Sequence, residues 1–88
     1  MNILVVGGGG REHAIAYALS KSPLTKKLIV APGNPGIEAF AECFSIPADD
    51  IDGQCRLAED IKADIVFIGP EIPLVLGLKN KLSEIGIN

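Results

Sequence analysis

Four consecutive glycines, Gly7–Gly10, follow a short apolar stretch near the start of the chain and precede Arg11. Glycine loses more conformational freedom on folding than any other residue, so this run is costly unless the backbone must approach another group closely. At the start of a helix, such a run exposes N–H groups that bind anions, and Arg11 adds a positively charged fork. The run therefore predicts a phosphate-binding loop. A tight strand–helix turn that needs small residues only for packing is the alternative.

The glycine loop lacks the signatures of the common nucleotide sites. The dinucleotide fingerprint G-x-G-x-x-G would place Glu12 or His13 at its last glycine, depending on the register. The second expected strand ends at Ala31–Pro32, without the acidic residue that binds ribose hydroxyls in that fingerprint. No Walker A lysine follows the glycines either. A phosphorylated molecule smaller than NAD or a nucleoside triphosphate is therefore favoured.

Two further loops rich in glycine and proline are expected beside the glycine loop. They are Pro32–Gly36 and Gly69–Leu74. Each follows an expected strand, and the carboxyl ends of parallel strands form the ligand-binding edge of an open sheet. The connectors at the opposite edge are ordinary polar segments. This asymmetry predicts a binding site at the edge where the three loops meet.

The polar side chains near these loops have more than one interpretation. His13, the single histidine, is either a packed or capping residue or a catalytic one. Glu12 can complement the positive end of the helix dipole. Asn34 is compatible with a simple turn position. Glu71 either binds ribose hydroxyls or a substrate amine, or caps the last helix.

The elements that must position these residues follow from the hydrophobic pattern. Short runs of Ile, Leu, Val and Ala are typical of strands buried on both faces, and apolar residues at helical spacing predict helices. The expected strands are 2–6, 27–31, 43–46 and 64–68; the expected helices are 11–20, 51–61 and 75–85, with one helical turn at 38–42. This alternation predicts an α/β, Rossmann-like open parallel sheet built from βαβ units, with its strands in the order third, second, first, fourth.

Composition and charge limit the classes of function. The chain has 88 residues and a net charge of −3, so it is one small domain, and its scattered lysines make nucleic acid an unexpected partner. Cys43 and Cys55 are too far apart for a CxxC motif and are expected to be reduced core residues. No apolar run resembles a signal peptide or a membrane span, so a soluble, cytoplasmic protein is expected. Asp49, Asp50 and Asp52 are expected to form the solvated start of a helix and not a metal site.

Three motifs in this order resemble one known family. "GGGGREHA", "APGNPG" and "GPEIPLV" are similar to the N-terminal domain of the phosphoribosylamine–glycine ligases, also called glycinamide ribonucleotide synthetases, which are ATP-grasp ligases of de novo purine biosynthesis. The resemblance covers the whole chain, and members of the family are several times longer. Residues 1–88 are therefore expected to be a pre-ATP-grasp, substrate-binding domain, a fragment of a longer enzyme that stops before its last strand.

The resemblance also implies a function. The family joins glycine to 5-phosphoribosylamine while ATP is converted to ADP and phosphate, through an acyl phosphate on glycine. ATP and Mg²⁺ (or Mn²⁺) would bind in the ATP-grasp domain outside this chain, so no cofactor, metal or catalytic residue is expected here, and the fragment alone should be inactive. The substrate-binding residues implied by position are Gly8, Gly9, Gly10 and Arg11 at the phosphate, and Gly33, Asn34 and Glu71 beside the sugar.

Other interpretations remain open at this point. The main alternative is a stand-alone Rossmann-type nucleotide-binding or regulatory module, and an NAD-dependent dehydrogenase is a weaker one. An ATP-grasp pattern in the sequence that follows would favour the ligase. A missing fifth strand would leave the fourth as an exposed edge, so copies of the fragment are expected to associate through their strands.

Overall fold

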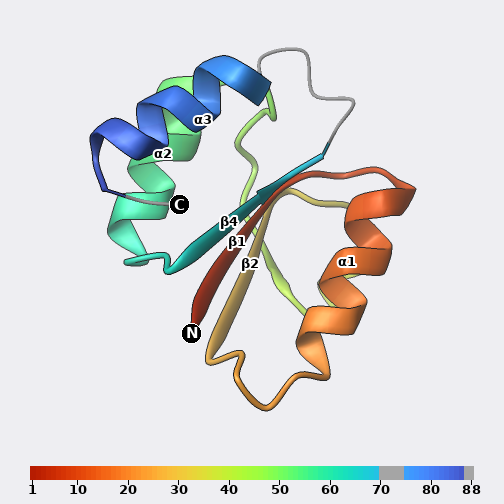
Figure 1. Ribbon diagram of the computed structural model, residues 1–88. Helices are drawn as coiled ribbons and strands as arrows, with labels where there is room; N and C mark the ends of the chain where they lie inside the picture. The colour runs from red at the N-terminus through yellow and green to blue at the C-terminus, as the bar shows by residue number, and fades with distance from the viewer. Residues whose placement is uncertain (70–74, 87–88) are drawn as a thin grey trace.

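The structure, a computed structural model, describes residues 1–69 and 75–86. Its strands are β1 (Asn2–Gly7), β2 (Lys27–Pro32), β3 (Glu42–Cys43) and β4 (Ile65–Ile68). Its helices are α1 (Gly10–Ser20), α2 (Ile51–Asp60) and α3 (Val75–Glu84), with a short 3₁₀ helix, η1 (Ile37–Ala39). Strands and helices alternate along the chain, as the hydrophobic pattern predicts (Figure 1).

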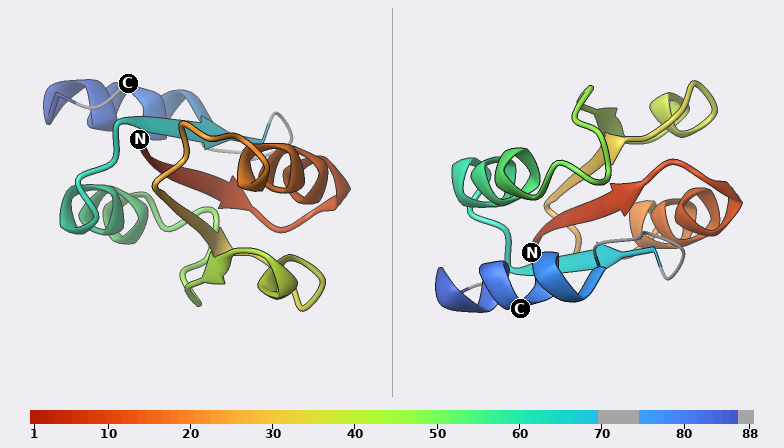
Figure 2. Two further views of the ribbon diagram at one scale, coloured as in Figure 1. Left: turned by 90° about the horizontal axis from the view of Figure 1, so that it is seen from below. Right: turned by 90° about the horizontal axis from the view of Figure 1, so that it is seen from above.

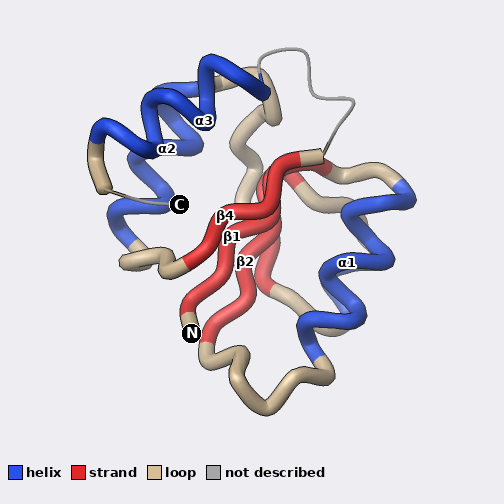
Figure 3. Tube along the Cα trace, in the orientation of Figure 1, coloured by secondary structure: helices blue, strands red, loops and turns tan. Residues whose placement is uncertain are grey.

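The strands form one parallel sheet in the order β3-β2-β1-β4, which confirms the predicted order. In the register of this sheet, Gly7 lies opposite Pro32 on β2, and Val6 lies opposite Ile68 on β4. The carboxyl ends of β2, β1 and β4 therefore meet at one edge of the sheet. The loops that leave β1 and β2 emerge there side by side (Figure 3).

The helices cover both faces of the sheet, with α2 and α3 on one face and α1 and η1 on the other (Figure 2). Successive residues of a strand point to opposite faces. On the first face the buried side chains are Leu4, Val6, Ile29, Ala31, Cys55, Leu57, Ala58, Leu78 and Leu82. On the second face they are Ile3, Val5, Ala16, Val30 and Ile37. Burial on both faces explains why β1 and β2 are continuously apolar.

A buried amide ties the sheet to the segment that follows β3. Gln54, on α2, is fully buried, and its Nε2 lies 3.1 Å from each of three carbonyl oxygens, those of Ala31, Ile46 and Pro47. Ala31 is near the carboxyl end of β2. The amide therefore holds the irregular segment 46–47 against the strand that leads into the second loop.

The third strand and the helical turn before it differ from the sequence prediction. β3 spans only Glu42–Cys43, because Phe44 N–H makes the last ladder bond to Val30 O (3.0 Å) and Ile46 N–H then turns back onto Phe44 O (2.8 Å). The predicted strand 43–46 was therefore too long and displaced. The helical turn is a 3₁₀ turn at Ile37–Ala39 and not at 38–42, because it begins where the Asn34 carbonyl oxygen and side chain bind the Ile37 N–H.

The first turn of α2 gives a test of local stability. Asp50 is its N-cap, and its Oδ1 accepts a hydrogen bond from Gly53 N–H (2.9 Å). Replacing Asp50 with alanine should lower the free energy of unfolding by about 1 kcal/mol, because one N–H of the first turn loses its acceptor. Urea unfolding measures this change. Asp49→Ala is the control, since the Asp49 side chain makes no hydrogen bond to a described residue, and an equal loss in both variants would contradict the capping role.

Candidate functional site

The three predicted loops begin next to one another at the carboxyl edge of the sheet. Gly33 N–H donates to Gly7 O (3.0 Å), which joins the second loop to the glycine loop. Gly69 N–H donates to Val6 O (3.2 Å), which places the start of the third loop against the end of β1. Glu71, the predicted sugar-side residue of the third loop, lies outside the described residues.

The first two glycines of the run are required by packing. Gly7 has a φ of +132°, and a side chain there would also collide with Glu12. A β-carbon on Gly8 would lie 2.5 Å from the carbonyl oxygen of Gly33, a backbone atom that cannot swing aside. Close contact between the two loops therefore accounts for both residues.

The last two glycines of the run start α1. Gly9 is the N-cap in an extended conformation, and its carbonyl accepts the first helical bond from His13 N–H (3.0 Å). Gly10 is the first helical residue, exposed, and a β-carbon there would meet no described atom within 4 Å. The backbone N–H groups of Gly10, Arg11 and Glu12 make no hydrogen bond to any described residue. They are the free donors of a helix N-terminus, which attract anions.

Arg11 lies at this helix start with its side chain exposed. Within the described residues, it forms no ion pair; the ion pair present joins Lys81 to Asp52 (2.6 Å) between α3 and α2. The hydrogen bond from Lys81, and to a smaller extent the lysine's positive charge, hold the pKa of the Asp52 carboxyl below its usual range. The arginine therefore adds a positive charge beside these N–H groups, and no described residue forms an ion pair with it.

Asn34 connects two loops through its side chain. Its Nδ2 donates to Gly8 O (2.8 Å), and its Oδ1 accepts from Ile37 N–H (3.0 Å). It lies next to Gly33, whose φ of +71° is a left-handed conformation that favours glycine. The amide therefore fixes the distance between the glycine loop and the second loop, a role beyond the simple turn position that its flanking residues indicate.

The two cysteines are free thiols, as the sequence predicts. Cys55 is buried in the core, whereas Cys43 is only half-buried. The Cys43 sulfur packs against Gly33 from β3, and a side chain on that glycine would collide with it. Desolvation, more than the nearby carboxylate of Glu38, raises the pKa of the Cys43 thiol, so it stays neutral beside the second loop.

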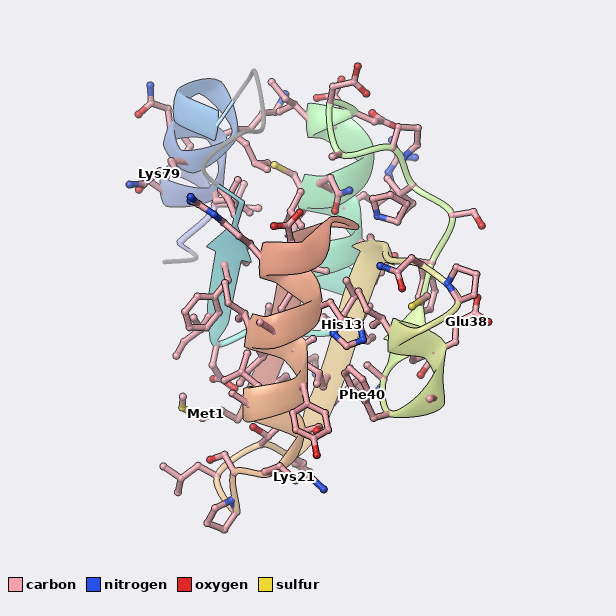
Figure 4. The ribbon with its side chains drawn as sticks, turned by 90° about the vertical axis from the view of Figure 1, so that its right-hand side faces the viewer. Met1, His13, Lys21, Glu38, Phe40 and Lys79 are labelled. Atoms are coloured by element: carbon pink, nitrogen blue, oxygen red, sulfur yellow. The ribbon has the colours of Figure 1, made fainter. Side chains whose placement is uncertain are left out.

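His13 is a packing residue of the second face. Its ring meets Phe40 edge to face, with centroids 5.4 Å apart and planes at 85°. Figure 4 shows these two side chains pointing toward each other across the gap between α1 and the η1 segment. A β-carbon on Gly36 would lie 3.4 Å from His13 Nε2, so the second loop also passes close to the ring. This geometry supports the packed interpretation of the histidine.

Among the described residues of the site, Glu12 is the one charged residue that is buried, with 1% of its surface exposed. Its Oε1 accepts a hydrogen bond from Gly9 N–H (3.0 Å), in the reciprocal half of a capping box. Sequence reasoning assigned Glu12 only to the helix dipole. The signal that was available is its position three residues after the N-cap, where Glu returns to bind the N-cap N–H.

The described residues show neither a metal cluster nor a membrane helix. Within 1–69 and 75–86, no group of three or more His, Cys, Asp or Glu side chains is placed to hold a metal ion. Over the same ranges, every helix is too short or too polar to cross a bilayer.

A parallel α/β sheet, with a glycine loop at its carboxyl edge and first-turn N–H groups of α1 that have no acceptor among the described residues, defines a Rossmann-like domain. Comparison with known families identifies which one. The family model described as phosphoribosylglycinamide synthetase, N domain, matches residues 1–88, and the chain belongs to this family.

Curated relatives carry the corresponding enzyme name. The chain is 53% identical over 87 residues to a phosphoribosylamine–glycine ligase of Caulobacter vibrioides, a match that covers 99% of this chain and 20% of the relative. It is 47% identical to the enzyme of the same name from Phenylobacterium zucineum and 46% identical to that of Mycobacterium leprae, each over 99% of this chain and 21% of the relative. The chain thus spans about a fifth of the length of these relatives.

Proposed function

We propose that this chain is the substrate-binding N-terminal domain of a longer, cytoplasmic phosphoribosylamine–glycine ligase. The whole enzyme would join glycine to 5-phosphoribosylamine with ATP, in purine biosynthesis. The family membership of residues 1–88 and the names of the relatives support this assignment. ATP and Mg²⁺ or Mn²⁺ would bind in an ATP-grasp domain outside this chain, and the domain alone would be inactive.

The observation that carries the proposal is the free start of α1. The N–H groups of Gly10, Arg11 and Glu12 have no described acceptor, and the exposed Arg11 side chain lies beside them. A phosphate group accepts several such bonds at once and is stabilised by the helix dipole. The 5-phosphate of phosphoribosylamine is therefore the group that we assign to this position.

The remaining predicted residues would shape the sugar side of the site. Gly33 and Asn34 hold the second loop against the glycine loop, so they would set the width of the space available to the ribose. Glu71 would approach the ribose or the amine from the third loop. The domain would make no bond itself, and its contribution would be to position the amine near the activated glycine.

Arg11→Ala tests this assignment in a full-length ligase that carries the domain. The KM for phosphoribosylamine should rise by roughly 10- to 150-fold, which corresponds to the loss of about 1.5–3 kcal/mol for a hydrogen bond to a charged group. The KM values for ATP and glycine should stay near those of the wild type. Steady-state kinetics with each substrate varied in turn measure the three constants.

Arg56→Ala is the matched control, because Arg56 is an exposed arginine on α2, an element on the other face of the sheet. It should leave all three KM values unchanged. An unchanged KM for phosphoribosylamine in Arg11→Ala would show that the start of α1 is not the phosphate site. Tighter binding of NAD than of ribose 5-phosphate would favour the dinucleotide-binding alternative instead.

A further inference from the structure

A buried carboxylate lies beneath the proposed phosphate site. Glu12 is 1% exposed, and no described cation forms an ion pair with it. Its Oε1 is bound by Gly9 N–H, but its Oε2 is buried and has no hydrogen-bond partner among the described residues. A buried charged group with an unsatisfied oxygen is expensive, so its presence at a site calls for an explanation.

The carboxylate fills the space between the ends of two strands. A β-carbon on Gly69 would lie 2.9 Å from Glu12 Oε2, and one on Gly7 would overlap the same carboxylate. Gly7 ends β1, and Gly69 directly follows β4. Glu12 therefore contacts, from the first turn of α1, both the glycine loop and the start of the third loop.

The Glu12 carboxylate also decides which N–H groups remain for an anion. Gly9 N–H is already bound by Oε1, so a phosphate must bind the backbone N–H groups that follow it, those of Gly10, Arg11 and Glu12 in the first turn. A bond from an N3 side chain to the N-cap N–H fixes the direction in which the chain enters the helix. The orientation of the free donors therefore depends on the carboxylate.

We propose that Glu12 is a positioning residue for phosphoribosylamine. Its carboxylate fixes the glycine loop so that the free N–H groups of Gly10 and Arg11 point at one phosphate, and it sets the start of the third loop against that loop. The Glu12 side chain does not touch the substrate itself. This inference rests on the function proposed above.

Two substitutions of Glu12 in the full-length ligase test the proposal. Glu12→Ala removes the acceptor for Gly9 N–H, and the KM for phosphoribosylamine should rise at least tenfold while the KM for ATP stays unchanged. Glu12→Gln keeps an acceptor oxygen and nearly the same volume, so it should restore the KM to within about threefold of the wild type. Both variants are compared by steady-state kinetics and by thermal unfolding.

Leu57→Ala is the control for a purely structural effect, because Leu57 is a buried core residue on α2, on the other side of the sheet. It should lower the midpoint of thermal unfolding without changing the KM for phosphoribosylamine. A Glu12→Ala enzyme that loses stability as Leu57→Ala does, but keeps the wild-type KM, would overturn the proposal.

A third variant keeps the test decisive if Glu12→Ala does not fold. Glu12→Asp retains the charge but is one methylene shorter, so it cannot reach Gly9 N–H from the same position, and it should raise the KM at least fivefold. A wild-type KM in Glu12→Asp would overturn the proposal. A raised KM in Arg11→Ala together with wild-type values in every Glu12 variant would refute only this inference, whereas an unchanged KM in Arg11→Ala would refute the phosphate site on which the inference rests.

Discussion

Replacing Gly8 with alanine is expected to destabilise the domain by about 1–3 kcal/mol, the range for forcing an extra group into a packed space. The new β-carbon would lie 2.5 Å from Gly33 O, so one of the two loops must move. Such a movement strains two hydrogen bonds that join the loops, from Gly33 N–H to Gly7 O and from Asn34 Nδ2 to Gly8 O. Urea unfolding of the domain measures the loss.

The same substitution should raise the KM for phosphoribosylamine in the full-length ligase, because the displaced loop carries the start of α1 with it. Gly77→Ala is the matched control. Gly77 lies inside α3, where a β-carbon would approach only the end of the flexible Ile51 side chain, at 3.3 Å. Alanine is the better helix former, so this control should be neutral or slightly stabilising. A Gly8→Ala domain as stable as Gly77→Ala would show that the contact between the loops does not hold them.

Sequence reasoning reached the sheet order because few topologies are compatible with the pattern of elements. Apolar runs such as 2–6, separated by amphipathic segments, specify buried parallel strands, and the crossover rules then leave few arrangements. It misplaced β3 because the length of an edge strand depends on whether its backbone groups bond to the sheet or to other residues. The Ile46 carbonyl is taken by Gln54 from α2, a long-range contact that no local pattern reveals.

In the candidate site, too, the sequence predicts the features that depend on neighbouring residues and misses those that depend on contacts between distant segments. The free N–H groups at Gly10 and Arg11 follow from a glycine run that enters a helix, which is a local feature. Gly7 and Gly8 cannot carry a side chain, because it would collide with Glu12 and with the Gly33 carbonyl, respectively. Both collisions depend on how loops from different strands approach each other. Sequence reasoning treated the four glycines as one phosphate loop, but packing accounts for two of them.

A side chain at Gly10 should affect substrate binding and not stability, in contrast to one at Gly8. A β-carbon in a helix points toward its N-terminus, so a side chain at the first helical residue lies over the end of the helix, in front of the free N–H groups. Apart from its chain neighbours and its own helix, no described atom lies within 4 Å of that position, so a ligand there would displace none of the other described residues. We therefore expect Gly10→Val to raise the KM for phosphoribosylamine by roughly 100-fold or more, because the phosphate loses several charge-assisted hydrogen bonds at once.

Unlike Gly8→Ala, this substitution should leave stability almost unchanged. Gly10 already has a helical backbone, and the β-carbon added there meets no described residue beyond its own helix, so the free energy of unfolding should stay within about 0.5 kcal/mol of the wild type. Ala14→Val adds bulk at an exposed position one turn later on α1; it should leave the KM unchanged and cost at most about 0.7 kcal/mol of stability, because valine is a poorer helix former than alanine. If Gly10→Val keeps the wild-type KM, no ligand approaches the start of α1. If it unfolds as readily as Gly8→Ala, then Gly10 is a packing residue like its neighbour, and the run is a tight turn without a ligand.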